Sequence, residues 1–150
     1  MKLQRQTVFG GAYAPVGERG NCFSTCLACI LGIDTKHVPN FMDSSGDGGA
    51  WFDAAHEWLH PRGLSLICWE GEKSPVSYAP QSHKDCVLIA SGDSPRGSYL
   101  HSVLWKHEKM LHDPHPSDAG LVGLPKDWCL VIMFDHDLFA EFRKSIDPQD

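Results

Sequence analysis

The sequence predicts a single α+β domain in which helices come first and a mainly antiparallel sheet follows. Its 150 residues, 42% of them hydrophobic, suit one compact domain spanning residues 1–150. Apolar residues recur at three- and four-residue intervals in the first part of the chain, and after residue 64 they gather in short β-branched or aromatic runs. The links between these runs are too short for helical crossovers, so we expect the strands to pair antiparallel.

The expected helices are short and are bounded by turn and capping residues. Residues 1–20 are rich in glycine and contain Pro15, so we expect an extended arm there. Beyond the arm, the sequence predicts a buried helix over 22–33 with Asn21 or Ser24 as its N-terminal cap, a turn at 34–39, a loop at 44–49, an aromatic helix within 49–63 that ends at Gly63, and a helix over 135–145 that is capped by Asp135 and buries Leu138, Phe139 and Phe142.

The expected strands are the short apolar runs that lie between Gly, Pro and Asp residues. They span 64–69, 86–91, 99–106, 109–113 and 128–134. The third and fourth form a hairpin, because only a short polar segment separates them. With a tight turn near residues 107 and 108, residues whose numbers sum to about 214 face each other, which pairs Asp113 with His101.

Charge and hydropathy exclude several classes of function. The net charge is −6 and the 13 Lys and Arg residues are scattered, so the basic stripe of a nucleic-acid-binding protein is missing. No window reaches the roughly 18 apolar residues of a membrane span, and no long apolar run follows the first residues. We therefore expect a cytoplasmic protein with no nucleic-acid or membrane partner, in which most of the six cysteines are buried and reduced.

The stretch GNCFSTCLACILG, residues 20–32, carries three cysteines whose spacing has two interpretations. Cys22, Cys26 and Cys29 resemble the ligands of an iron–sulfur cluster, but the chain has neither the length nor the alternating strands and helices of such enzymes. The alternative is one reactive thiol, because the start of a helix lowers the pKa of Cys22. His101 would then accept the thiol proton and Asp113 would orient the imidazole. Cys26 and Cys29 would fill the core, where burial raises the pKa of a thiol.

The order and sequence surroundings of three of these residues resemble those of the papain-like cysteine peptidase superfamily. The most similar branch is the leader-peptidase-like one, whose members trim bacteriocin precursors. The resemblance rests on Cys22 in GNCFSTCLACILG, His101 in HSVLW and Asp113 in LHDP, in that order. It implies a papain-like fold, with the nucleophile helix first, and a Cys-His-Asp triad that needs no cofactor. The same layout resembles small uncharacterised proteins of bacteriophages and bacteria, which implies a phage protein that acts in the host cytoplasm.

The chain departs from that branch in the residue that would complete the oxyanion hole. Leader peptidases have a glutamine a few residues before the nucleophile, whereas Val16 stands six residues before Cys22. The candidates for the side-chain donor are Gln6, Gln4 and Asn21. The backbone N–H of Cys22 is expected to contribute whichever side chain helps, since it lies at the start of the helix.

Two other functions stay open beside a cysteine-nucleophile hydrolase or acyltransferase that acts on an amide or thioester bond. A papain-like shell without activity would be a binding module. A zinc site would need His107, His112 and His115 with Asp113, but strand alternation turns these side chains apart, so we expect no metal. Arg96, in the SPRG loop, either binds a substrate carboxylate or phosphate or is a solvated turn residue. The sequence leaves a peptide, a peptidoglycan cross-link, an isopeptide and a small γ-glutamyl compound as equal candidates for the substrate.

Overall fold

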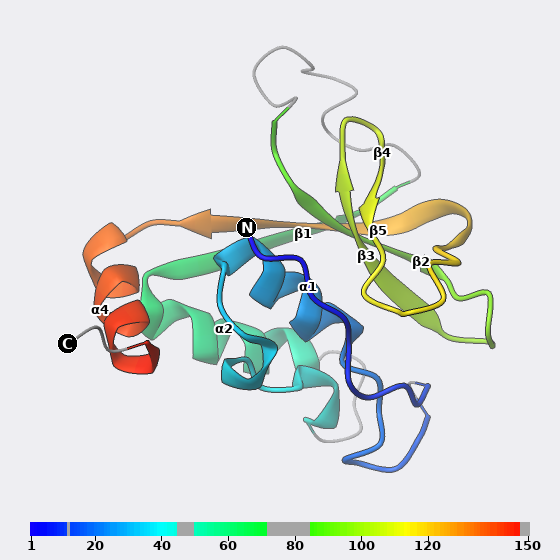
Figure 1. The fold of residues 1–150 in the computed structure, drawn as a ribbon, viewed down its shortest axis with the longest axis horizontal. Helices are drawn as coiled ribbons and strands as arrows, with labels where there is room; N and C mark the ends of the chain where they lie inside the picture. The colour runs from blue at the N-terminus through cyan, green and yellow to red at the C-terminus, as the bar shows by residue number, and fades with distance from the viewer. Residues whose placement is uncertain (12, 45–49, 72–84, 148–150) are drawn as a thin grey trace.

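The computed structural model of the chain describes residues 1–11, 13–44, 50–71 and 85–147. It has two layers, with helices packed on one side of a five-stranded sheet (Figure 1). The main elements are α1 (Cys22–Leu31), α2 (Ala50–Leu59), β1 (Leu64–Glu70), β2 (Leu88–Asp93), β3 (Leu100–Lys106), β4 (Lys109–His112), β5 (Val122–Met133) and α4 (His136–Ile146), with short 3-10 turns at Thr35–His37, Phe41–Asp43 and His60–Arg62. The predicted α+β class is confirmed.

The sheet has the order β1-β5-β2-β3-β4, and each neighbouring pair of strands is antiparallel, as predicted. Strand β5 begins at Val122, six residues earlier than expected. The sequence concealed this part of the strand because Gly123 and Pro125 have the character of turn residues. The strand tolerates them where its pairing with β2 is irregular, between Ser91 and Asp93.

Helix α1 is the centre of the core. Eight of its residues are buried, and it ends at Gly32, whose left-handed φ of 68° closes the last turn. Neither predicted N-terminal cap acts as one, so that expectation was wrong. The Asn21 side chain accepts from the backbone N–H groups of Thr7 and Val8, and the Ser24 hydroxyl donates to the carbonyl of Pro39.

Of the arm predicted over residues 1–20, the first eight residues run beside α1 (Figure 1), and a bridge between Gly10 and Arg19 closes the rest into a loop. The backbone N–H of Lys2 donates to the carbonyl of Cys29 in α1, and that of Gln6 donates to the carbonyl of Pro114, just after β4. The arm therefore lies between α1 and the end of the β3–β4 hairpin. The predicted loop at 44–49 lies, apart from residue 44, outside the described residues.

The remaining helices close the helical layer largely as expected. The Asp135 carboxylate caps α4 by accepting from two backbone N–H groups of its first turn. Phe139 is buried, but Leu138 is exposed, so the expectation that Leu138 points inward was wrong. In α2 the predicted aromatic face packs on the core edge, and the Trp51 ring meets that of Phe23 at 5.0 Å between centroids.

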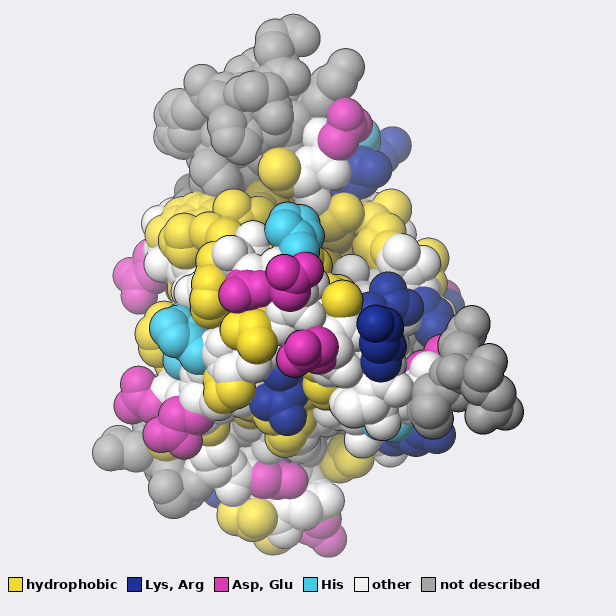
Figure 2. Space-filling view, turned by 90° about the vertical axis from the view of Figure 1, so that its left-hand side faces the viewer, with side chains coloured by type: hydrophobic (Ala, Val, Ile, Leu, Met, Phe, Trp, Pro, Cys, Tyr) yellow, Lys and Arg dark blue, Asp and Glu magenta, His cyan; other side chains and the backbone are white. Residues whose placement is uncertain are grey.

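The surface mixes side chains of opposite charge with apolar ones. On the face shown in Figure 2, Lys and Arg side chains lie among Asp and Glu rather than in one stripe. Among the described residues, no helix is long and apolar enough to cross a membrane.

Two glycines offer a matched test of the packing just before the start of β1. Gly63 and Gly32 both have left-handed backbones, with φ of 74° and 68°. A Cβ on Gly63 would collide with the backbone oxygen of Asp135, whereas a Cβ on Gly32 meets open space. We expect Gly32→Ala to lower the free energy of unfolding by about 1 kcal/mol and Gly63→Ala by about 3 kcal/mol, because the second adds steric overlap to backbone strain. Chemical denaturation of both variants measures this, and equal losses would contradict the packing at Gly63.

Candidate active site

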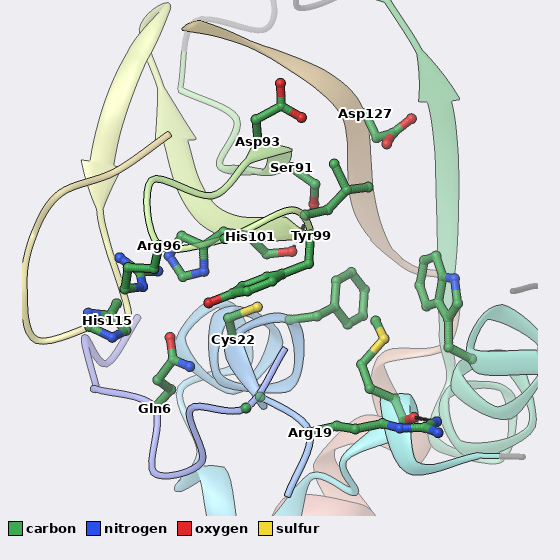
Figure 3. A pocket seen from close by; sticks show the side chains of 18 of the residues that line it. Gln6, Arg19, Cys22, Ser91, Asp93, Arg96, Tyr99, His101, His115 and Asp127 are labelled. Atoms are coloured by element: carbon green, nitrogen blue, oxygen red, sulfur yellow. Dashed lines mark hydrogen bonds between the residues drawn. The ribbon is translucent and has the colours of Figure 1, made fainter. Parts of the chain in front are cut away.

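Cys22 is the first residue of α1, and its side chain faces a large cavity at the end of that helix. The cavity has a volume of about 1440 Å³, and its wall includes Gln6 from the arm, His101 and Ser102 from β3, and His115. Figure 3 shows these parts of the chain arranged around the Cys22 sulfur. Cys22 as a residue is half-buried, and it forms part of the cavity wall.

A buried hydrogen bond joins His101 to Asp113. Nε2 of His101 lies 2.7 Å from Oδ1 of Asp113, and the two residues are 2% and 1% exposed. The carboxylate also accepts from the backbone N–H groups of His115, at 2.9 Å, and Gly120, at 2.8 Å. With Nε2 held by the carboxylate, Nδ1 is the ring nitrogen left for the thiol of Cys22.

The hairpin brings these two residues together by a route that differs from the predicted one. Its turn lies at 107–108 as expected, with positive φ at both positions. However, the paired numbers sum to 215 next to the turn, as at Trp105 and Met110, and an irregularity between Leu104 and Trp105 then pairs Leu104 with His112, a sum of 216. Strand β4 ends at His112, and the Asp113 side chain reaches His101 from the following loop. The predicted contact is confirmed and the predicted strand register is wrong.

The electrostatics favour an ion pair between Cys22 and His101. Burial opposes ionisation of the thiol, but the His101 ring and the backbone and hydroxyl of Ser102 bring the pKa of Cys22 below its ordinary value. Burial also disfavours a charged His101, yet Asp113 and Cys22 raise the pKa of its ring to about 9. At Asp113 the penalty of burial is outweighed by His101 and backbone amides, which lower the pKa of the carboxylate. A thiolate facing an imidazolium is the state that these directions favour.

The other two cysteines of α1 belong to the core, as predicted. Cys26 and Cys29 are fully buried among residues such as Leu27. Burial raises the pKa of Cys26 well above its usual value, with further contributions from the Cys22 and Cys29 thiols, and burial also raises the pKa of Cys29. A neutral, enclosed thiol is a poor nucleophile, so Cys22 is the reactive position of the three.

The three histidines of the zinc alternative each contact a different part of the chain. Nε2 of His112 donates to the carbonyl of Gln4, at 2.6 Å, and His107 lies 3.8 Å from Asp85. His115 bonds to the hydroxyl of Ser117. Within the described ranges, no three His, Cys, Asp or Glu side chains are grouped so as to hold a metal ion.

Of the three candidate oxyanion donors, Gln6 is the one that the described residues place in the cavity wall. Gln6 is 6% exposed, its Nε2 donates to the carbonyl of Val8 at 2.8 Å, and its buried Oε1 has no described partner. Gln4 bonds instead to the backbone of Ile33 and Thr35. Figure 3 shows Gln6 on the arm beside Cys22.

Asn21 does not fit the oxyanion role that the sequence left open for it. Its Oδ1 accepts from Thr7 and Val8, its Nδ2 donates to the Thr7 hydroxyl, and the residue is outside the cavity wall. Asn21 therefore fastens the arm to the start of α1. This use was not predictable from the sequence, because it depends on the path of residues 7–8.

Arg96 and His115 lie at one edge of the cavity (Figure 3). Arg96 is exposed and its guanidinium donates to the Ser117 hydroxyl at 3.2 Å, so it is both a cavity residue and a solvated one. The His115 ring lies edge-on to that of His101, with 6.2 Å between centroids. Burial and then the Arg96 charge lower the pKa of His115. The sequence had suggested His115 only as a metal ligand.

The floor of the cavity contains a disulfide that the sequence did not predict. Cys68 of β1 and Cys129 of β5 are bonded, which corrects the expectation of reduced cysteines for these two. The register places them directly opposite each other, with 4.3 Å between Cα atoms. Since 61 positions separate them in sequence, only the pairing of β1 with β5 reveals their proximity.

The ion pair predicts an unusual pH profile for Cys22. Alkylation by iodoacetamide, located by mass spectrometry, should be fast at neutral pH and slow only as pH falls through the lowered pKa of the thiol. His101→Asn should slow labelling at pH 6 about tenfold or more, because loss of the imidazolium raises the pKa of the thiol. Because folding raises the pKa of His101, its positive charge adds to the free energy of unfolding. This contribution is fully present below the pKa of the ring in the unfolded chain and is lost as pH rises through about 9.

Cys86, a half-buried free cysteine, is the reference thiol in the same labelled sample. His101→Asn should leave its labelling rate unchanged, and circular dichroism should show a native fold. Equal pH profiles for Cys22 in the parent and in His101→Asn would contradict the ion pair.

The cavity wall thus includes the thiol of Cys22 and the imidazole of His101. Asp113 lies outside the wall and holds the His101 ring by a buried hydrogen bond. Such an arrangement can form and break an acyl–sulfur bond. No family model, curated protein or solved structure matches this chain, so the chemistry of the cavity is inferred from the residues themselves.

Proposed function

We propose that this protein is a cysteine-nucleophile hydrolase or acyltransferase that acts on an amide or thioester bond of a peptide or related substrate. One observation carries the proposal: the thiol at the start of α1 shares a cavity with His101, whose Nε2 is 2.7 Å from a buried Asp113 carboxylate. Nucleophile, base and orienter are the three parts of a triad, whatever the fold that carries them.

The chemistry follows from the ion pair. The Cys22 thiolate attacks the substrate carbonyl carbon, and the carbonyl π electrons move to oxygen. The tetrahedral intermediate collapses to a thioester as His101 gives its proton to the leaving nitrogen or sulfur. Neutral His101 then takes a proton from water, or from an acceptor nucleophile, which attacks the thioester and releases the thiolate. Asp113 holds the ring in place and stabilises its charged form.

The oxyanion would be stabilised by two N–H donors. The backbone N–H of Cys22 lies at the start of α1, where the helix dipole favours negative charge. Gln6 is the side-chain partner that the cavity supports, because its amide is buried in the cavity wall. An amide held by a carbonyl on one hydrogen keeps a second hydrogen for a ligand.

The papain-like architecture is part of this proposal. In its favour, the helix that begins with the nucleophile comes first, packs on an antiparallel sheet, and lies against the strand that carries the histidine near its start. The phage origin rests on the sequence resemblance alone.

A cytoplasmic location is likewise proposed, and the Cys68–Cys129 disulfide bears on it. Cytosolic reductants keep most thiols reduced, which counts against the location. Cys129 is 6% exposed, but Cys68 is only half-buried and both residues line the cavity, so burial does not shield the bond fully.

The absence of a nucleic-acid partner also stays within the proposal, supported by the net charge of −6 and by the mixed charges of the face in Figure 2. A binding module that has kept the triad but turns nothing over is the alternative from another class. It would have the same cavity, so only activity separates the two.

Two cysteines of α1 provide the decisive comparison. Against a panel of fluorogenic peptide amides and thioesters, Cys22→Ala should lower kcat/KM more than about a thousandfold, because no other group replaces the nucleophile. Cys26→Ala should retain activity and lose only stability, since Cys26 is a fully buried core residue.

The reverse pattern would overturn the assignment, and turnover by neither protein would favour the binding module. Dialysis of the parent protein against EDTA is the control for the zinc alternative. Activity that survives dialysis supports the triad, and its loss would support a metal site.

The two arm glutamines test the oxyanion hole. Gln6→Ala should lower kcat about a hundredfold with little change in KM, because an oxyanion donor acts mainly in the transition state. Gln4→Ala is the matched control, since its amide bonds to Ile33 and Thr35 away from the cavity. It should alter thermal stability and leave kcat unchanged. Equal kcat for Gln6→Ala and the parent enzyme would exclude Gln6 from this role.

A further inference from the structure

A row of polar side chains runs across four neighbouring strands of the sheet, and one end of the row lies near Cys22. Glu70 of β1, Asp127 of β5, Ser91 of β2 and Ser102 of β3 are direct partners in register, so they lie side by side on neighbouring strands. All four line the cavity that contains Cys22. At the end of the row nearest Cys22, the hydroxyl oxygens of Ser91 and Ser102 are 2.8 Å apart.

We propose that the Ser102 hydroxyl donates a hydrogen bond to the ionised sulfur of Cys22, and that Ser91 positions this hydroxyl by donating to it. The inference rests on the proposed function, since it assigns a role in the reactivity of the same thiol. Ser102 touches the reacting atom, whereas Ser91 acts only through Ser102.

The position of Ser102 supports a contact with the sulfur. Ser102 lies two residues before Leu104, so both side chains point to the same side of β3. Leu104 is a core residue that packs with α1, which puts Ser102 on the helix side of the sheet near the first turn of α1. The backbone and hydroxyl of Ser102 both help to lower the pKa of Cys22, after the larger effects of burial and His101.

The donor and acceptor positions of the two hydroxyls fix the direction of the hydrogen bonds from Ser91 to Cys22. A thiolate only accepts hydrogen bonds, and a hydroxyl has one donor and two acceptor positions. When Ser102 donates to sulfur, its oxygen can still accept from Ser91, and this gives the order Ser91 to Ser102 to Cys22. When the sulfur is acylated and loses its charge, the Ser102 hydroxyl can rotate and donate to Ser91 instead. Neither state leaves a buried hydroxyl without a partner.

A purely structural role explains these serines poorly. Other buried positions on the helix side of the sheet are apolar, as at Leu66, Ile89 and Leu104. Ser102 is 6% exposed, and a hydroxyl at such a position adds a desolvation cost that an alanine or valine would avoid. A hydrogen bond to a charged acceptor is about twice as strong as a neutral one, which offsets this cost when the thiol is ionised.

The test measures the pH profile of Cys22 alkylation in the full chain, with Ser102→Ala, Ser91→Ala and the double variant. Ser102→Ala should slow labelling about tenfold at pH 6, which corresponds to a pKa higher by about one unit. Ser91→Ala should slow it about threefold. Ser91→Ala should have no further effect in the Ser102→Ala background, because it acts only through Ser102.

Three controls separate the possible outcomes. Ser65→Ala, on β1 and outside the cavity wall, should leave the profile unchanged. Ser102→Thr, which keeps the hydroxyl, should label as fast as the parent protein, and circular dichroism should show a native fold in each variant.

The outcomes distinguish this inference from the proposed function. Fast labelling of Cys22 that needs His101 but is unaffected by Ser102→Ala would overturn this inference and keep the proposed function. Slow labelling of Cys22 in the parent at neutral pH would count against the proposed function, while the difference between parent and Ser102→Ala would still test Ser102. Additive effects of the two serine variants would exclude Ser91 as a positioning residue.

Discussion

The buried carboxylate of Asp113 is the constraint around which the cavity is organised. An ionised carboxylate removed from water is stable only when its oxygens are hydrogen-bonded, and Asp113 receives the His101 ring and two backbone N–H groups. Its carbonyl oxygen also accepts from the guanidinium of Arg5, at 2.6 Å. The ring that faces the nucleophile, the loop after β4 and the N-terminal arm therefore share one anchor. A change at this residue would reach all three.

The arm has a second anchor at Asn21, and the two together place Gln6. Asn21 binds the backbone at Thr7 and Val8, while the N–H of Gln6 donates to the chain just after Asp113. Because Asn21 is occupied in this way, no side chain caps α1 and the N–H groups of its first turn remain for a ligand in the cavity. A residue expected to cap the helix instead holds a distant segment against it. The cost of an uncapped helix is consistent with a site that needs those donors.

Local patterns were enough to predict the helices, most strands and the contact between His101 and Asp113. Apolar spacing located α1, and the order of Cys22, His101 and Asp113 is visible in the chain itself. What could not be predicted depends on the pairing of distant segments. The irregularity between Leu104 and Trp105 shifts the hairpin register without any mark in the sequence, and the contact between Ser91 and Ser102 exists only because β2 pairs with β3. The same holds for the disulfide between β1 and β5.

The two hydrogen-bond systems that we propose at the Cys22 sulfur would differ in how they respond to pH. His101 attracts the thiolate through its charge, which it loses as pH rises through about 9. The hydroxyls of Ser91 and Ser102 do not titrate in this range, so their contribution would persist. Above that pH the sulfur would remain a nucleophile, but the ring would no longer hold the proton that the leaving group needs. Thiol reactivity and turnover therefore have different upper limits, because the thiolate and the acid depend on different groups.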